Sequence, residues 1–174
     1  MTASLKPLLN WTSDDLMSAS VVMVPEEMSL QGAAHLLAQA HVTGAPVVNS
    51  EGRCVGVLSS TDFVNWVDRH RDKPVAPQTE YCASWQLVDP GELPKDAVHN
   101  YMTRDPVTVS QTSSIGELAR LMIDNHIHRV IVTEKTGKPI GIVSSTDVLA
   151  AVARADPAGA APRGAAYVEE TVSC

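Results

Sequence analysis

The stretch Gly56-Val57-Leu58-Ser59-Ser60-Thr61-Asp62 returns later in the chain as Gly141-Ile142-Val143-Ser144-Ser145-Thr146-Asp147. The two stretches lie 85 residues apart, and the same offset aligns residues 16–67 with residues 101–152 without a gap. In this register 15 of 52 positions are identical. A tetrapeptide can match by chance, but a register kept over the whole range indicates two copies of one supersecondary unit.

Each copy is predicted to contain a short strand, a helix, a hairpin of two strands and a final helix. The predicted strands are residues 21–24, 46–48 and 54–58 in the first copy and 106–109, 130–132 and 140–143 in the second. Ser29 and Ser114 are the expected N-caps of the first helices, because a serine hydroxyl satisfies free backbone N–H groups there. The final helices are expected at 62–67 and 147–153. The sequence thus predicts an α/β (α+β) fold in which two β-α-β-β-α repeats pack as a pseudo-two-fold pair.

The remaining segments are polar or rich in proline, alanine and glycine. We expect an N-terminal tail (1–11), the first repeat (12–67), a connector (68–97), the second repeat (98–153) and a C-terminal tail (154–174). Trp85, followed by Leu87 and Val88, suggests that part of the connector packs against the repeats.

Composition excludes several classes of function. The formal net charge of −7 argues against a nucleic-acid surface, because phosphate binding needs a basic stripe. No apolar run approaches the roughly 20 residues that cross a bilayer. The three cysteines are widely spaced and odd in number, which is not the pattern of a disulfide framework. We therefore expect a soluble, cytoplasmic protein that binds neither nucleic acid nor membrane.

Two β-α-β-β-α units, each with Gly-apolar-apolar-Ser-x-x-Asp before its final helix, resemble a pair of CBS (cystathionine β-synthase) domains. The resemblance implies a stand-alone, non-catalytic regulatory module whose inter-repeat cleft accepts AMP, ADP or ATP, with S-adenosylmethionine as a variant ligand. It also implies a flat homodimer that signals to an unidentified regulated protein by conformational change. No cofactor is implied. The sequence shows no nucleophile–base arrangement, Walker loop or dinucleotide fingerprint, so we do not expect an enzyme.

The residues expected to contact the ligand lie where each final helix begins. Asp147 could accept two hydrogen bonds from a ribose diol, while Ser144 and Thr146, beside free N–H groups of the helix, suit ribose or phosphate oxygens. The matched residues of the first copy are Asp62, Thr61 and Ser59. Ser-Ser-Thr-Asp is also the pattern of an ordinary helix cap, so capping alone is the alternative interpretation.

The two copies differ before their second predicted strand. The second copy has Ile127-His128-Arg129 where the first has Val42-Thr43-Gly44. The string Ile-His-Arg is similar to one in the γ subunit of AMP-activated protein kinase, and the resemblance implies that Arg129 and His128 reach a nucleotide phosphate. Both residues could instead be ordinary surface side chains. We expect one competent phosphate site, or one shared site, rather than two equal ones, centred on Asp147, Thr146, His128 and Arg129.

Two further expectations concern the ligand. Thr108, matched by Met23 in the first copy, lies in a strand that the resemblance places beside the ligand. His126 and His128 have only one nearby carboxylate, Asp124, whereas tight metal sites want three or four ligands, so no metal is expected. The alternative to nucleotide binding is a constitutive interaction or scaffolding module with a vestigial cleft.

Overall fold

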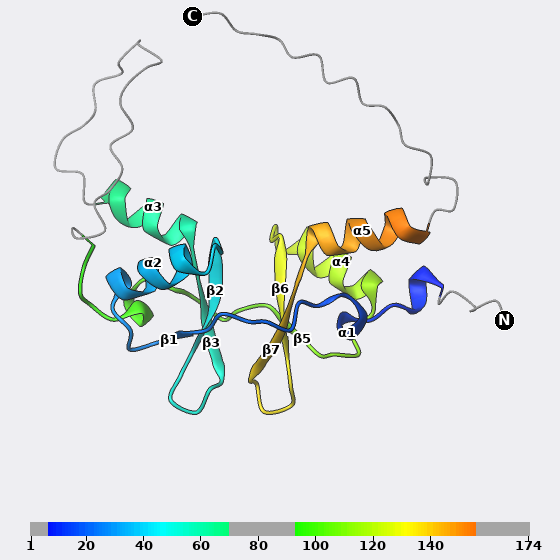
Figure 1. The fold of residues 1–174 in the computed structure, drawn as a ribbon, viewed down its shortest axis with the longest axis horizontal. Coiled ribbons are helices and arrows are strands. Elements are labelled where there is room, and N and C mark those ends of the chain that lie inside the picture. Colours follow the sequence, from blue (N-terminus) through cyan, green and yellow to red (C-terminus); the bar gives the residue numbers. More distant parts are fainter. Residues whose placement is uncertain (1–6, 70–92, 156–174) are drawn as a thin grey trace, which may run out of the picture.

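The computed structural model describes residues 7–69 and 93–155, which form two β-α-β-β-α units side by side (Figure 1). The two small sheets lie next to each other in the middle, and each unit places its two helices on its outer side (Figure 1). This arrangement confirms the predicted fold class. The part of the connector that contains Trp85, Leu87 and Val88 lies outside the described residues, as do 156–174 of the predicted C-terminal tail.

Both units have the same order of elements. The first unit contains β1 (Val24–Pro25), α2 (Leu30–Gln39), β2 (Gly44–Val48), β3 (Cys54–Ser59) and α3 (Ser60–Arg69). The second contains β5 (Thr108–Val109), α4 (Ile115–Asp124), β6 (Arg129–Thr133), β7 (Pro139–Ser144) and α5 (Ser145–Ala155). The first strands are shorter than predicted, and α3 and α5 begin two residues before the predicted aspartates. They begin earlier because the serine at the end of each preceding strand, not the aspartate, is the residue that leads into the helix.

The first helix of each unit starts and ends in the same way. Ser29 and Ser114 are the N-caps, as predicted: their hydroxyls accept hydrogen bonds from backbone N–H groups three residues later, at 3.0 and 3.2 Å. The helices end before His41 and His126, whose φ angles are both 53°. A residue in this left-handed region closes a helix by turning the chain back onto its last carbonyl groups. The two units therefore share the backbone conformation at both ends of this helix.

Within each unit, the three strands make one parallel and one antiparallel pairing. β1 runs parallel to β2, and β2 runs antiparallel to β3. β5 runs parallel to β6, and β6 runs antiparallel to β7. Each unit buries its own apolar cluster between its sheet and its helices. The largest fully buried aliphatic side chains are those of Val24, Leu30, Val47, Leu58, Val98, Leu118, Val130, Val132 and Val143.

The segment preceding each unit packs against the other unit. Ser18 pairs with Ile142 on β7, and Thr103 of β4 (Thr103–Arg104) pairs with Val57 on β3. The two pairings follow the 85-residue offset, so they are equivalent. This exchange ties the two units together along the pseudo-two-fold axis.

The exchanged segments also contain short helical turns, namely 3-10 helix η1 (Leu8–Asn10), α1 (Ser13–Leu16) and 3-10 helix η3 (Val98–Asn100). The Trp11 carbonyl accepts a hydrogen bond from Ile115 N at 2.9 Å, as the Asp96 carbonyl does from Leu30 N at 3.0 Å. Residues 7–11, expected to belong to a tail, are thus part of the folded body. No local pattern in residues 7–11 indicates this packing, because their partners lie about a hundred positions away.

Candidate functional site

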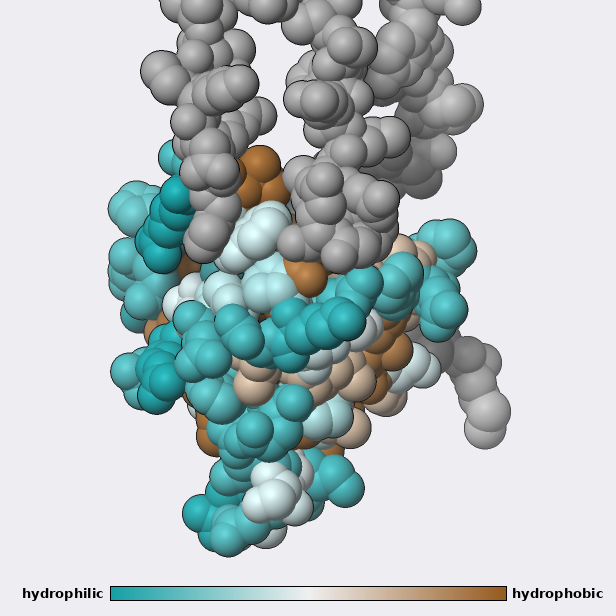
Figure 2. Space-filling model, turned by 90° about the vertical axis from the view of Figure 1, so that its left-hand side faces the viewer, coloured by the Kyte–Doolittle hydropathy of each residue, from teal (hydrophilic) through white to brown (hydrophobic). Residues whose placement is uncertain are grey.

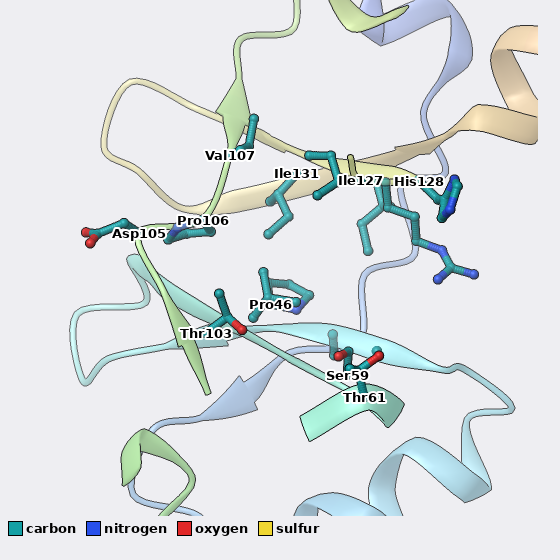
Figure 3. Close-up of a pocket in the computed structure, with 15 residues that line it drawn as sticks. Pro46, Ser59, Thr61, Thr103, Asp105, Pro106, Val107, Ile127, His128 and Ile131 are labelled. Atoms are coloured by element: carbon teal, nitrogen blue, oxygen red, sulfur yellow. The ribbon is translucent and has the colours of Figure 1, made fainter. Parts of the chain in front are cut away.

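A cavity of about 380 Å³ lies between the two units. Figure 3 shows side chains of both units facing each other across it. Its walls come from β2, β3 and the start of α3 on one side, and from residues 105–107, β6 and β7 on the other. The volume lies in the range of sites that enclose small molecules.

The middle of the cavity is apolar. Pro46 of the first unit faces Ile131 of the second, and Val107 lies on the same wall as Ile131 (Figure 3). Val57 and Ile142 also line the cavity. Two apolar walls that face each other form a slot suited to a flat ring, because both faces of the ring are then removed from water.

Polar groups gather at one end of this slot. Ser59 and Thr61 lie where α3 begins, and His128 lies opposite them, beside Arg129 at the start of β6. The first turn of a helix offers unpaired backbone N–H groups and the positive end of its dipole. Hydroxyl groups, free N–H groups and a guanidinium at one place make a site suited to an anion.

The two aspartates of the repeated motif both stabilise the start of their own helix. Asp62 Oδ2 accepts hydrogen bonds from Ser59 N at 2.7 Å and Ser59 Oγ at 2.9 Å. Asp147 Oδ2 accepts the same two bonds from Ser144, at 2.7 and 2.6 Å. Both aspartates therefore take part in capping their own helix. This role does not exclude a ligand contact, because a carboxylate offers about four acceptor positions and capping occupies two.

Asp62 is the aspartate associated with the cavity. Its second oxygen, Oδ1, lies 3.5 Å from the hydroxyl oxygen of Thr103. Thr103 and Ser59, both bonded to Asp62, line the cavity. Asp62 itself does not line the cavity and is connected to it through its hydrogen bonds to these two side chains.

The structure does not bring together the residues expected to form one site. His128, Arg129 and Ile127 line the cavity with Ser59 and Thr61 of the first unit. The predicted partners from the second unit do not line it; these are Ser144, Thr146, Asp147 and Thr108. In this cavity the start of α3 from the first unit, and not the start of α5, therefore lies with His128 and Arg129 of the second.

The residues around Asp147 belong to the equivalent position on the opposite side of that axis. By the 85-residue offset, Thr43 and Gly44 occupy there the places that His128 and Arg129 hold in the cavity. Neither Thr43 nor Gly44 can provide a positive charge there. The two copies thus differ as predicted, but Arg129 of the second unit lies in the cavity with Ser59 and Thr61 of the first unit.

Sequence reasoning missed the cavity residues contributed by the exchanged segment, which are Thr103, Asp105, Pro106 and Val107. Asp105 has a φ angle of 55°, and its counterpart Ser20 is not among the positive-φ residues of the described chain. Such a backbone is uncommon for a residue other than glycine. An Asp-Pro step at the beginning of a repeat was the only available signal.

Other reactive groups lie outside the cavity. Burial raises the pKa of the Cys54 thiol, and burial followed by the neighbouring Asp96 raises the pKa of Tyr101. Neither side chain lines the cavity. Within residues 7–69 and 93–155, no group of three or more His, Cys, Asp or Glu side chains is arranged to hold a metal ion. None of the helices in these ranges is long and apolar enough to span a membrane.

The sequence was compared with protein families and with known proteins, and both comparisons find CBS domains. The CBS domain model matches residues 13–69 and 98–154. The chain is 28% identical over 150 residues to an uncharacterized protein of Methanocaldococcus jannaschii, covering 79% of this chain and 89% of that protein. It is 27% identical over 140 residues to the chloroplastic CBS domain-containing protein CBSX2 of Arabidopsis thaliana, covering 74% and 57%. Three other relatives are longer, and the matches span only 20%, 40% and 32% of them.

Solved structures show the same fold. CBSX2 in complex with AMP superposes with a TM-score of 0.62 at 25% identity, covering 83% of this chain and 97% of that one. The CBS domain of a membrane protein from Sphaerobacter thermophilus gives 0.63 at 27% identity, covering 82% and 88%. A CBS domain pair in complex with 5′-methylthioadenosine and S-adenosylmethionine gives 0.62 at 20% identity, covering 80% and 98%, which supports the fold alone.

Proposed function

The chain belongs to the CBS domain family, and from this premise we propose that it is a non-catalytic regulatory module that binds an adenine nucleotide between its two units. One observation carries the proposal: an apolar slot ends at a helix N-terminus, two hydroxyl groups and a guanidinium. Such a cavity matches a molecule with a flat ring at one end and an anion at the other. The AMP complex of the similar protein CBSX2 supports the same class of ligand.

The proposed orientation follows from the chemistry of the walls. The adenine ring lies between Pro46 and Ile131, where burial of its faces is favourable. The ribose lies beside Asp62, whose carboxylate accepts hydrogen bonds from the hydroxyl groups. The phosphate lies between the start of α3 and Arg129, where the helix dipole and the guanidinium both favour negative charge.

The charge at the polar end favours a nucleotide over S-adenosylmethionine. A phosphate gains charge-assisted hydrogen bonds from Arg129, whereas a sulfonium at the same end would face a like charge. We therefore expect AMP, ADP or ATP to bind more tightly than S-adenosylmethionine. The reverse order would favour a sensor of S-adenosylmethionine.

The proposal is tested by calorimetry with AMP, ADP, ATP and S-adenosylmethionine. Arg129→Gln removes the guanidinium charge, and we expect AMP affinity to fall about 10- to 100-fold, because a hydrogen bond to a charged group contributes roughly 1.5–3 kcal/mol. Arg120→Gln, on the exposed surface of α4, is the matched control and should bind AMP as the wild type does. Absence of binding by the wild type at millimolar ligand would refute the proposal and favour a scaffolding module.

We further propose that the protein acts as a homodimer in the cytoplasm. Two apolar side chains at matched positions of the final helices are exposed: Val64 on α3 is 65% exposed and Leu149 on α5 is 67% exposed. Val152 and Ile123 add apolar surface on α5 and α4. The outer face of the first unit is mainly hydrophilic, with small apolar patches (Figure 2). A second copy related by two-fold symmetry would cover the matched pair at once.

The regulatory step requires that the nucleotide bind two arrangements of the units unequally. The cavity is suited to this, because its walls belong to different units and a ligand between them fixes their relative position. A regulated protein would respond to that change in geometry.

A further inference from the structure

Arg129 is hydrogen-bonded to the other unit. Its Nη1 atom donates to Thr43 Oγ1 at 3.0 Å. Thr43 lies between α2 and β2 and does not line the cavity. The bond therefore joins a cavity side chain of the second unit to an exposed residue of the first unit, next in sequence to the cavity residue Gly44.

Thr43 is held in place by its backbone. Its carbonyl accepts a hydrogen bond from Ser60 N, the first residue of α3, at 2.9 Å. The preceding residue, Val42, donates its N–H to the Leu37 carbonyl at 3.1 Å and so closes the end of α2. The Thr43 backbone is thus held beside the start of α3, whose first turn lies at the polar end of the cavity.

An exposed arginine needs such support. Its side chain has about 2 kcal/mol of rotamer entropy to lose when it is held in one position. The hydrogen bond to the Thr43 hydroxyl restricts the rotamers of the Arg129 side chain before any ligand binds. The guanidinium has five N–H donors, so one bond to Thr43 leaves four for a phosphate, enough for a bidentate contact.

We propose that Thr43 is the positioning residue for Arg129, so that the phosphate affinity of the cavity depends on a hydrogen bond between the two units. This inference rests on the nucleotide-binding function proposed above. Thr43 touches no ligand; it acts by holding the guanidinium above the start of α3. The same bond gives the phosphate a direct influence on the contact between the units.

Thr43→Val tests the role of the hydroxyl with little change in shape. We expect AMP affinity to fall about 3- to 10-fold, since one hydrogen bond contributes roughly 0.5–1.5 kcal/mol. Adenosine has no phosphate, and its affinity, measured by NMR titration, should stay unchanged. Thr43→Ser keeps the hydroxyl and should bind AMP nearly as the wild type does. Thr133→Val, at the end of β6 and outside the cavity, is the control for the same chemical change elsewhere.

A double-mutant cycle tests whether Thr43 acts through Arg129. In the Arg129→Gln background, Thr43→Val should have no further effect on AMP affinity. Equal weakening of AMP and adenosine, unchanged or tighter AMP binding by Thr43→Val, or additive losses in the double variant would each overturn the role of Thr43. If the wild type binds neither AMP nor adenosine, the proposed function and this inference both fail. If only the Thr43 variants depart from expectation, the inference alone fails.

Discussion

The two repeated aspartates provide a matched pair of substitutions that distinguishes capping from ligand binding. Asp62→Asn and Asp147→Asn make the same chemical change at equivalent positions of α3 and α5. Each asparagine keeps one oxygen that can accept the backbone N–H of the preceding serine. Each loses the carboxylate charge that favours the N-terminus of the helix. The loss of capping should therefore be similar in the two variants, although only Asp62 also accepts a hydrogen bond from Thr103, at 3.5 Å.

The magnitudes separate the two roles. The loss of a good cap costs roughly 0.5–2 kcal/mol, and we expect both variants to be destabilised by about 1 kcal/mol. For a protein of this size this lowers Tm by about 2–4 °C. Of the two aspartates, only Asp62 is hydrogen-bonded to residues that line the cavity, Ser59 and Thr103. Loss of a charge-assisted bond to a ribose hydroxyl should therefore weaken AMP binding about 10- to 100-fold in Asp62→Asn and not in Asp147→Asn.

The assay combines thermal unfolding without ligand and calorimetry with AMP, on both variants and the wild type. Similar losses of Tm with AMP affinity lost only in Asp62→Asn would support the cavity as the site. The opposite order of affinities would refute our reasoning and move the site to the residues around Asp147. Equal losses of affinity would mean two equivalent sites and would contradict the asymmetry of the cations.

Two further predictions concern assembly and stability. Leu149→Glu puts a charge on the exposed apolar surface of α5, and light scattering should show monomers where the wild type forms dimers. The control, Glu117→Gln on the exposed surface of α4, should leave the mass unchanged. A dimeric Leu149→Glu variant would contradict the proposed interface. His126→Gly should raise the free energy of unfolding in urea by roughly 0.5–1 kcal/mol, because glycine adopts the observed φ of 53° without the penalty of a side chain; His126→Ala is the control, and equal stabilisation by alanine would contradict this explanation.

The fold could be predicted from the sequence because its signals repeat. The 85-residue offset, the serine caps and the alternation of strands and helices all describe short segments, and each was seen twice. The exchange of the segments before each unit could not be predicted in this way. Ser18 and Thr103 form their sheet pairings with residues distant in sequence, and neither segment carries the apolar alternation of an ordinary strand.

The same dependence on residues distant in sequence explains why the grouping expected around Asp147 is not found in the cavity. The Ile127–Arg129 string and the Ser144–Asp147 motif are close in sequence and belong to one repeat, so they were expected to act together. Residues of one repeat need not share a cleft when two repeats pack around an axis. Here the His128 carbonyl does bond to Ser145 N, at 2.9 Å, but the Arg129 side chain crosses to Thr43. The sequence identified the candidate anion-binding groups, and the packing of the two units determines which of them line one cavity.

The difference between Gly44 and Arg129 explains why a nearly symmetric frame offers one cationic site. A Cβ atom on Gly44 would lie 3.1 Å from the Leu58 carbonyl oxygen and 3.3 Å from Ser59 Cα. A side chain there would press on the end of β3, where the hydroxyl of Ser59 faces the cavity. An arginine at position 44 would therefore require the end of β3 to move by a few tenths of an ångström. With Gly44 lacking a side chain, the neighbouring Thr43 is left to support Arg129, which makes the two units unequal contributors to one site.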